Sequence, residues 1–417
     1  MVPPLPQELL ELIIDAVYTS SGTAPLKTLS RVSRAWRPRS QNNIFKKLLL
    51  DYAVIKRIHS ETAERTVATT GDTSQRPPIV FSYVRKLHIA ARQFTSPESD
   101  EEYLEILRFF TNVISLRILD WDFREFETHH ITRFLSHFGA TVRSLKLHEC
   151  YVDSEVLIFL ISSFSFVDNL EIDPRYPCSS VTYKIKKSDR PSVGNVGFRG
   201  NLVFRFLSAQ HEEFLAFVNE NSSDVRSISA ELCVNKGELQ RLFDCCGGNL
   251  STVGVHSLWK PGEAIPTKAR RDPNAHHSPD LVSLSPCTQL QTLSIHLLGD
   301  FKPDDPNWDS LFGITSPHLE EIQIRSFDGM VTNRSLVGWE AIDDLLSRYY
   351  DRSVRNGVWN FRVTLHPTDI DSEEECAALL ECVWKAWPRF VKKGAVVLSL
   401  EPCDGENSYQ GFGSRVV

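Results

Sequence analysis

The sequence has no apolar run approaching the roughly 18 residues that a membrane-spanning helix needs. The best candidate, residues 156–167, is shorter and is interrupted by serines. The first ten residues, MVPPLPQELL, have neither the basic segment nor the continuous apolar segment of a secretory signal. We therefore expect a protein that is neither secreted nor associated with a membrane.

The chain also lacks the cysteine pattern of a disulfide framework. It has nine cysteines, an odd number, and no C-x-x-C pair. Scattered cysteines of this kind are typical of reduced thiols, so we expect a cytoplasmic and/or nuclear protein. Basic residues are fewer than acidic ones, 46 against 53, and the net charge of −7 argues against a general nucleic-acid binder.

Catalytic and metal-binding motifs are missing as well. The chain has no H-E-x-x-H, no G-x-S-x-G and no phosphate-binding G-x-x-x-x-G-K-[ST]. The adjacent pairs His129-His130 and His276-His277 do not form two-ligand sites, because neighbouring residues on a helix or strand point apart. We predict a non-catalytic protein with no cofactor and no metal site.

What the chain does have at its front is a short helical segment. Apolar residues recur at helical spacing after Leu5-Pro6, and Pro6 suits a first helical turn, where a missing N–H costs nothing. We expect this helix to end near Ser20-Ser21-Gly22, a second to run from Pro25 to Pro38, and a third to pass through residues 44–49. Three short helices are little chain for an independent core, so their apolar surface should continue onto a partner or onto the next domain.

This segment resembles the F-box family. The resemblance lies in LPQELLELIIDAV, LKTLSRVSRAW and IFKKLLL. It implies docking on a Skp-type adaptor and, through it, on a cullin of a ubiquitin ligase. An amphipathic helical edge with an aromatic anchor also suits docking in a partner's groove. The positions that the resemblance assigns to adaptor binding are Leu5, Pro6, Leu9, Ile13, Leu29, Val32, Ser33 and Trp36. The alternative is a cap that only closes the downstream domain.

Beyond a Thr-, Ser- and Pro-rich stretch, one pattern recurs along the chain: apolar-x-x-apolar-x-apolar. Its last two apolar positions alternate with a polar one, which is typical of a short strand with one buried face. The early copies start 29 residues apart, and one gap of 58 residues predicts a hidden copy at NLVFRF (201–206). Helical patterns stand between the early copies, at 101–110, 130–138 and 155–164. The copies are VRKLHI (84–89), VISLRI (113–118), VRSLKL (142–147), VDNLEI (167–172), VRSISA (225–230), LSTVGV (250–255), LQTLSI (290–295) and LEEIQI (319–324).

Strand, turn and helix at this period resemble a leucine-rich repeat. The family's N/C position holds Cys150 in VRSLKLHEC and, nearly, Cys233 in VRSISAELC, but no copy has the asparagine. Parallel strands stacked along one wall need crossovers, and helices supply them. We therefore predict an α/β protein in which a three-helix F-box-like module precedes an irregular leucine-rich-repeat-like solenoid.

The remaining segments complete the expected domain organisation. Residues 173–200 and 259–280 interrupt the repeats and are expected to be loops, either for binding or merely tolerated. Helix and strand patterns alternate again at 339–352, 360–365, 372–387 and 395–402, as in a terminal cap. The expected divisions are an F-box-like module (1–58), a linker or loop (59–80), the solenoid (81–335), an α/β cap (336–402) and a flexible tail (403–417).

These features together predict the substrate-recognition adaptor of a Skp/cullin/F-box type ubiquitin ligase, with a protein as its substrate. The alternative is a non-catalytic leucine-rich-repeat-like scaffold without a ligase role. The outward strand positions run from basic toward acidic residues along the array, ending at Glu171. The candidate substrate-binding residues on this face are Arg117, Lys146 and His148.

Overall fold

The chain folds into two compact units, residues 1–197 and 198–417, and each is described by itself. The computed structural model describes residues 6–51, 53–58, 60, 79–90, 106–123, 137–152, 154–174, 197–204, 211–222, 224–231, 236–256, 283–296, 313–325, 339–358, 360–366, 373–398 and 415–416.

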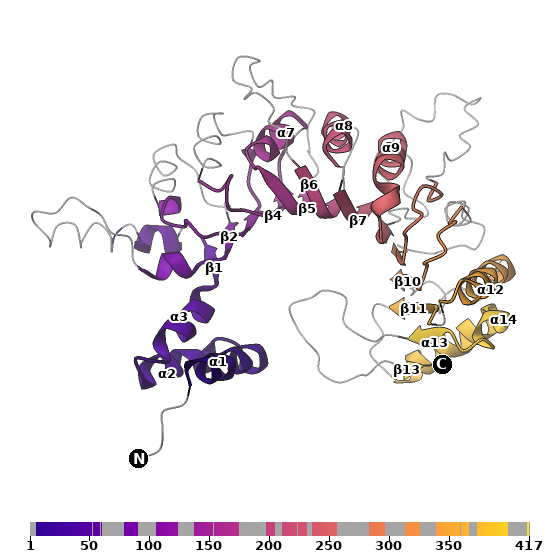
Figure 1. Ribbon diagram of the computed structural model, residues 1–417, viewed down its shortest axis with the longest axis horizontal. Coiled ribbons are helices and arrows are strands. Elements are labelled where there is room, and N and C mark those ends of the chain that lie inside the picture. The colour runs from indigo at the N-terminus through magenta and orange to yellow at the C-terminus, as the bar shows by residue number, and fades with distance from the viewer. Residues whose placement is uncertain are drawn as a thin grey trace, which may run out of the picture. The chain divides into compact units, whose positions relative to one another are not determined.

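The first unit begins with three helices and continues into parallel strands (Figure 1). Strands β1 to β5 pair in chain order, each parallel to the next. Helix α7 lies beside β4 and β5. The elements are α1 (Gln7–Ser21), α2 (Ala24–Val32), α3 (Arg37–Phe45), β1 (Lys47–Leu50), the 3-10 helix η1 (Ile79–Tyr83), β2 (Lys86–Ala90), β3 (Ser115–Leu119), β4 (Ser144–Cys150), α7 (Ser154–Ser162) and β5 (Phe166–Pro174).

Strand register in this unit follows the repeat seen in the sequence. Leu87, Leu116, Leu145 and Leu170 stand opposite one another across β2 to β5, and all are buried. The next apolar positions form a second buried row, and the residues between the two rows face the other side of the sheet. The repeat prediction is therefore confirmed for this unit.

The three helices differ from their expected bounds in two places. Helix α1 ends at Ser21 as predicted, where Gly22 has a φ of 70° and donates its N–H to the carbonyl of Tyr18. The second helix was expected to reach Pro38 but ends at Val32, because Ser33 is extended and Pro38 lies in the first turn of α3. The helix expected through residues 44–49 is also wrong, since Leu48 and Leu49 belong to β1, which pairs with β2. The parallel stack thus starts within the segment assigned to the helical module.

Four buried phenylalanines of the first unit occupy equivalent positions before successive repeat copies, and we call them the phenylalanine column. Each one precedes the first apolar residue of a repeat copy by three or four positions. Rings of Phe81 and Phe110 lie 4.9 Å apart between centroids. This column was not recognised from the sequence, although its spacing repeats with the strands. Its members are Phe81, Phe110, Phe138 and Phe164, and all are buried.

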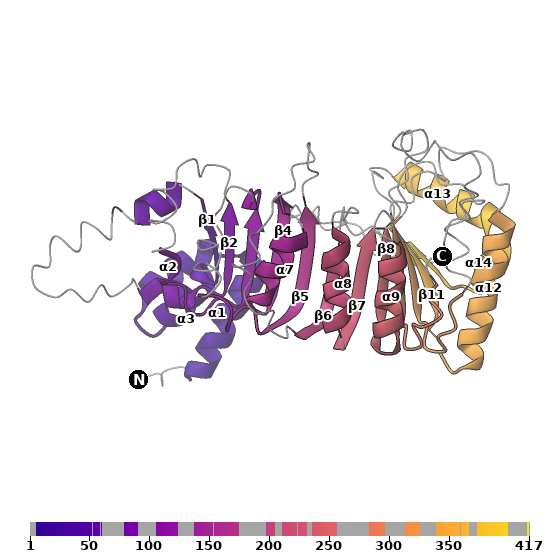
Figure 2. The same ribbon diagram turned by 90° about the horizontal axis from the view of Figure 1, so that it is seen from above.

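The second unit also stacks parallel strands, with α8 and α9 beside β7 (Figure 2). Strands β6 to β12 are parallel neighbours in chain order, and β13 pairs antiparallel with β12. The elements are β6 (Gly197–Phe204), α8 (Glu212–Asn221), β7 (Asp224–Glu231), α9 (Lys236–Cys246), the 3-10 helix η5 (Gly247–Asn249), β8 (Thr252–His256), β9 (Thr292–His296), β10 (Glu321–Arg325), α12 (Trp339–Arg355), β11 (Arg362–His366), α13 (Glu373–Ala386), α14 (Pro388–Val391), β12 (Val396–Leu398) and β13 (Arg415–Val416).

The hidden repeat copy is present in β6. Leu202 and Phe204 are buried and stand opposite Ile228 and Ala230 of β7. Leu202 and Phe204 therefore occupy the two alternating apolar positions, two residues before the predicted ones, and the first position of the next copy, Val225, lies opposite Gly200 across a register shift. Both units are mixed α/β with stacked parallel strands, which confirms the predicted class.

The C-terminal elements continue the stack of the second unit. The helix and strand patterns expected there form α12, β11, α13 and β12, and β11 pairs in register with β10. The segment 403–417 was expected to be frayed, but residues 415–416 form β13 because their backbone pairs with β12. Most of the predicted linker 59–80, residues 101–105 and 130–136 of the expected helices, most of the insertion 173–200 and all of the insertion 259–280 lie outside the described residues.

Candidate functional site

The helical module at the front of the first unit has a small core of its own. Helices α1, α2 and α3 contact one another pairwise. Leu10 and Ile14, four residues apart, form the inward stripe of α1, and Leu26 of α2 is fully buried with them. The module is therefore packed rather than a loose set of helices.

One carboxylate ties α1 to α3. Asp15 accepts a hydrogen bond from Nε of Arg39 at 2.9 Å, a second from its Nη2, and a third from Nδ2 of Asn43 at 2.8 Å. The Arg39 guanidinium lowers the pKa of Asp15, and the carboxylate in turn raises the pKa of Arg39. A bidentate pair of this geometry fixes the crossing of the two helices.

The opposite stripe of α1 is apolar but exposed. The exposed fractions are 46% for Leu9, 64% for Leu12 and 42% for Ile13, and Val32 at the end of α2 is 67% exposed. Leu9, Leu12 and Ile13 share one side of the helix, because they are three and four residues apart. We call these four residues the apolar helix face. Exposed apolar residues that are grouped on packed helices are typical of a surface for a partner.

The residues predicted to bind an adaptor fall into two groups. Pro6, Leu9, Ile13 and Val32 are exposed. Leu29, Ser33 and Trp36 are half-buried, and the Ser33 hydroxyl accepts a hydrogen bond from the N–H of Ala35, so these three also serve the module itself. Leu5 lies outside the described residues. Leu12 was missed, although its helical spacing from Leu9 marks the same face.

A second candidate surface is the outward face of strands β2 to β5. Strand register places His88, Arg117, Lys146 and Glu171 in one row across the four strands. His148 and Asp173 stand next to each other in the following row. The structure thus brings the three predicted substrate-binding residues together, and the row runs from basic to acidic as expected.

Glu171 organises the acidic end of this row. Nζ of Lys146 lies 2.5 Å from its Oε2, and Nε2 of His148 lies 3.4 Å from its Oε1. The other ring nitrogen of His148 lies 3.6 Å from Oδ2 of Asp173. His148 and Lys146 lower the pKa of Glu171 to about 2. Burial opposes the charge of His148, but the carboxylates of Asp173 and Glu171 outweigh it and raise the pKa of the imidazole.

Cys150 is the last residue of β4. Its Sγ donates to the carbonyl of Ile118 at 3.6 Å and lies 3.4 Å from the carbonyl of His148. Burial raises the pKa of this thiol to about 12. The Cys150 thiol therefore links the end of β4 to β3 by a hydrogen bond. Cys150 stands at the position where the repeat consensus has Asn or Cys.

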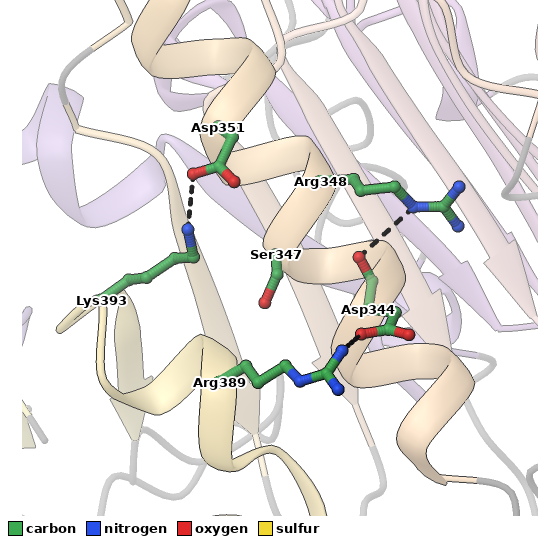
Figure 3. A pocket seen from close by; sticks show the side chains of 6 residues that line it. All are labelled: Asp344, Ser347, Arg348, Asp351, Arg389 and Lys393. Carbon is green, nitrogen blue, oxygen red and sulfur yellow. Dashed lines mark hydrogen bonds and ion pairs between the residues drawn. The ribbon is translucent and has the colours of Figure 1, made fainter.

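A charged hollow of about 560 Å³ lies on the second unit between α12 and the segment of α14 and Lys393 (Figure 3). Asp344 forms an ion pair with Arg389, and Asp351 lies 2.5 Å from Nζ of Lys393. Arg348 donates to the main-chain oxygen of Asp344, and Ser347 completes the lining. These ion pairs link the two segments, and charges of both signs alternate around the hollow.

The described residues hold no group of three or more His, Cys, Asp or Glu side chains placed to bind a metal ion. Among the helices of the described ranges, none is both long enough and apolar enough to cross a membrane.

Comparisons with known proteins give distant similarity to solved structures alone. No family model matches the sequence, and no curated protein matches it. Among solved structures, the chain is similar to the leucine-rich repeat-containing protein LegL7 from Legionella pneumophila. The sequences are 14% identical, the match covers 80% of this chain and 96% of that chain, and the TM-score is 0.37. Because this similarity is low, the repeats of the present chain are defined from the register of its own strands.

Proposed function

We propose that this chain is the substrate-recognition adaptor of a Skp/cullin/F-box type ubiquitin ligase, located in the cytoplasm and/or the nucleus. The helical module docks on a Skp-type adaptor, which in turn binds a cullin. The outward strand face of the first unit binds a protein substrate. The chain itself is not an enzyme in this proposal, because ubiquitin transfer belongs to its partners.

The observation that carries the proposal is the apolar helix face. Leu9, Leu12, Ile13 and Val32 are exposed on a module whose inward residues are well packed. Burying one such side chain stabilises a complex by about 1.5–3 kcal/mol, so covering this face provides a substantial part of the binding free energy. The resemblance of the module to F-boxes supplies the identity of the partner.

The contribution of the chain to ubiquitination is proximity. A substrate held on a rigid sheet presents its lysines repeatedly to the same conjugating enzyme, which raises their effective concentration. Side chains that project from paired strands are well positioned for this task, because the strands are fixed by their neighbours.

The experiment is co-purification of the full chain with a recombinant Skp-type adaptor. We expect Leu9→Asp and Ile13→Asp to abolish the complex, because each places a charge in the apolar contact. Ile114→Asp is the matched control, since Ile114 is 47% exposed and lies outside the apolar helix face. Circular dichroism should be unchanged in all three variants.

Two outcomes would contradict the proposal. If the wild-type chain does not bind the adaptor, the alternative of a repeat scaffold without a ligase role is favoured. If the complex forms and survives both α1 substitutions, the adaptor binds elsewhere and the apolar helix face has another use.

A further inference from the structure

Arg117 stands in the middle of the outward row of the first unit, and no described residue forms a hydrogen bond or ion pair with its side chain. It is the central residue of β3, and strand register places His88 on one side of it and Lys146 on the other. Neighbouring strands lie about 4.8 Å apart, so Arg117 is flanked on both sides by side chains that carry or can carry positive charge.

The neighbouring cations on β4 are already compensated. Lys146 is paired with Glu171, and His148 contacts both Glu171 and Asp173. Arg117 is half-buried, and its Nε is fully buried with no hydrogen-bond partner in the described part of the chain. Its positive charge also opposes protonation of His148.

An unpaired buried guanidinium nitrogen is costly. A buried charged donor without a partner has lost its hydrogen bonds to water and gained none in exchange. Nη1 and Nη2 of the same guanidinium are not buried in this way, so an acceptor on a ligand can reach them and compensate the charge of Arg117. The planar guanidinium offers two parallel N–H donors, which match the two oxygens of a carboxylate.

We propose that Arg117 binds the carboxylate of an acidic side chain in an extended segment of the protein substrate. A carboxylate fits better than a phosphate, because Glu171 and Asp173 close to the site repel a second negative charge. This inference rests on the proposed role of the strand face as the substrate-binding surface, and it adds the class of substrate.

The test measures binding of labelled peptides to the full chain by fluorescence anisotropy. The probe is an octapeptide of alternating glutamate and alanine, with glutamine–alanine and phosphoserine–alanine peptides as comparisons. We expect the glutamate peptide to bind best and Arg117→Gln to weaken its binding roughly tenfold or more, the loss expected for one charge-assisted hydrogen bond. Arg117→Lys keeps the charge but loses the paired donors, so its affinity should be intermediate.

The matched control is Arg241→Gln, which removes the same charge from an exposed position on α9. It should bind the glutamate peptide like the wild type. Because no described residue pairs with the Arg117 side chain, Arg117→Gln should keep or raise the melting temperature. Loss of binding that is accompanied by a lower melting temperature in both Arg117 variants would make Arg117 a structural residue and overturn the proposal.

Three other results would overturn it as well: no measurable binding of the glutamate peptide by the wild type, equal binding by Arg117→Gln, or binding of the phosphoserine peptide alone. Failure of the ligase proposal is seen separately, in co-purification with the Skp-type adaptor. Arg117→Gln should leave that complex intact, since it lies on a strand and not on the helical module.

Discussion

Asp15 of α1 and Arg39 of α3 form a two-point contact, in which Nε and Nη2 of the guanidinium donate to the two carboxylate oxygens. Asn43 adds a third donor from the same helix, α3. The first and third helices of the module are therefore joined through one acidic residue, while the apolar helix face lies on other positions of α1.

Asp15→Asn should loosen this contact. The pKa of Asp15 lies below its ordinary value of 3.8, so its stabilisation is present above that pH and is lost as the pH falls further. A partly exposed contact of this kind contributes about 1 kcal/mol, so hydrogen exchange of the α1 amides should speed up about fivefold at pH 7. Glu8→Gln, at an exposed position of the same helix, is the control and should have no such effect. An unchanged exchange rate in Asp15→Asn would contradict the role given to this contact.

Glu171→Gln should destabilise the first unit in a pH-dependent way. The substitution leaves Lys146 and the half-buried His148 without their shared anion, which costs about 2 kcal/mol at pH 7. Because the pKa of Glu171 is about 2, the stability that its charge provides is present above about 4.5 and is lost as the pH falls toward 2. In urea unfolding, the difference in the free energy of unfolding between Glu171→Gln and the wild type should therefore shrink as the pH falls through that range.

The same variant changes His148. Its pKa is raised by Asp173 and Glu171, so the stabilisation that its charge provides is present below the ordinary value of 6.5 and is lost as the pH rises through the raised value. Glu171→Gln should lower the pKa of His148 as measured by NMR titration. An unchanged titration would show that Glu171 does not act on this imidazole.

Asp343→Ala should be far more damaging than the same change at the next position. Asp343 is buried and accepts hydrogen bonds from the backbone N–H groups of Arg389 and Phe390, at 3.0 and 2.8 Å. Its loss leaves both donors unpaired, at a cost of about 2–4 kcal/mol in thermal or urea unfolding. Asp344→Ala removes only an exposed ion pair and should cost less than about 1 kcal/mol. Equal losses in the free energy of unfolding for Asp343→Ala and Asp344→Ala would contradict the stabilising role given to the hydrogen bonds of Asp343.

Phe138→Ala should remove a central member of the phenylalanine column. The side chain is fully buried, and truncation of a buried phenylalanine costs about 3–5 kcal/mol, because a cavity remains. Ile114→Ala, at an exposed position, should cost less than about 1 kcal/mol and serves as the control. Chemical unfolding monitored by fluorescence measures both. A small effect at Phe138 would mean that the column is not a major part of the core.

The repeat strands were predictable because their signal is local. Alternation such as Leu116–Arg117–Ile118 marks a strand with one buried face, and its recurrence, at 29 residues among the first three copies, indicates that the strands stack. The helix bounds were less predictable. The pair Leu48-Leu49 suits the end of an amphipathic helix as well as a strand, and pairing with Leu87 and His88 of β2 decides for the strand.

The candidate surfaces divide in the same way. Helical spacing alone places Leu9 and Ile13 on one side of α1, but it does not say which side is covered. The contacts of α1 with α2 and α3 decide that Leu10 and Ile14 are inside. The sequence also predicts that Arg117, Lys146 and His148 all point outward, and it does not distinguish among them. Only the pairing of the strands shows that Lys146 and His148 share the carboxylate of Glu171.

The sequence by itself determined the α/β class, the repeat interval and the residues that face away from the core, because each depends on contacts within a few residues of the chain. The tertiary structure decided where the stack begins, which stripe of α1 stays exposed and which cation remains unpaired. Those outcomes depend on residues in other elements of the chain. Asp15 and Arg39 are 24 residues apart, and Leu48 and Leu87 are 39 apart, and no local pattern specifies such partners.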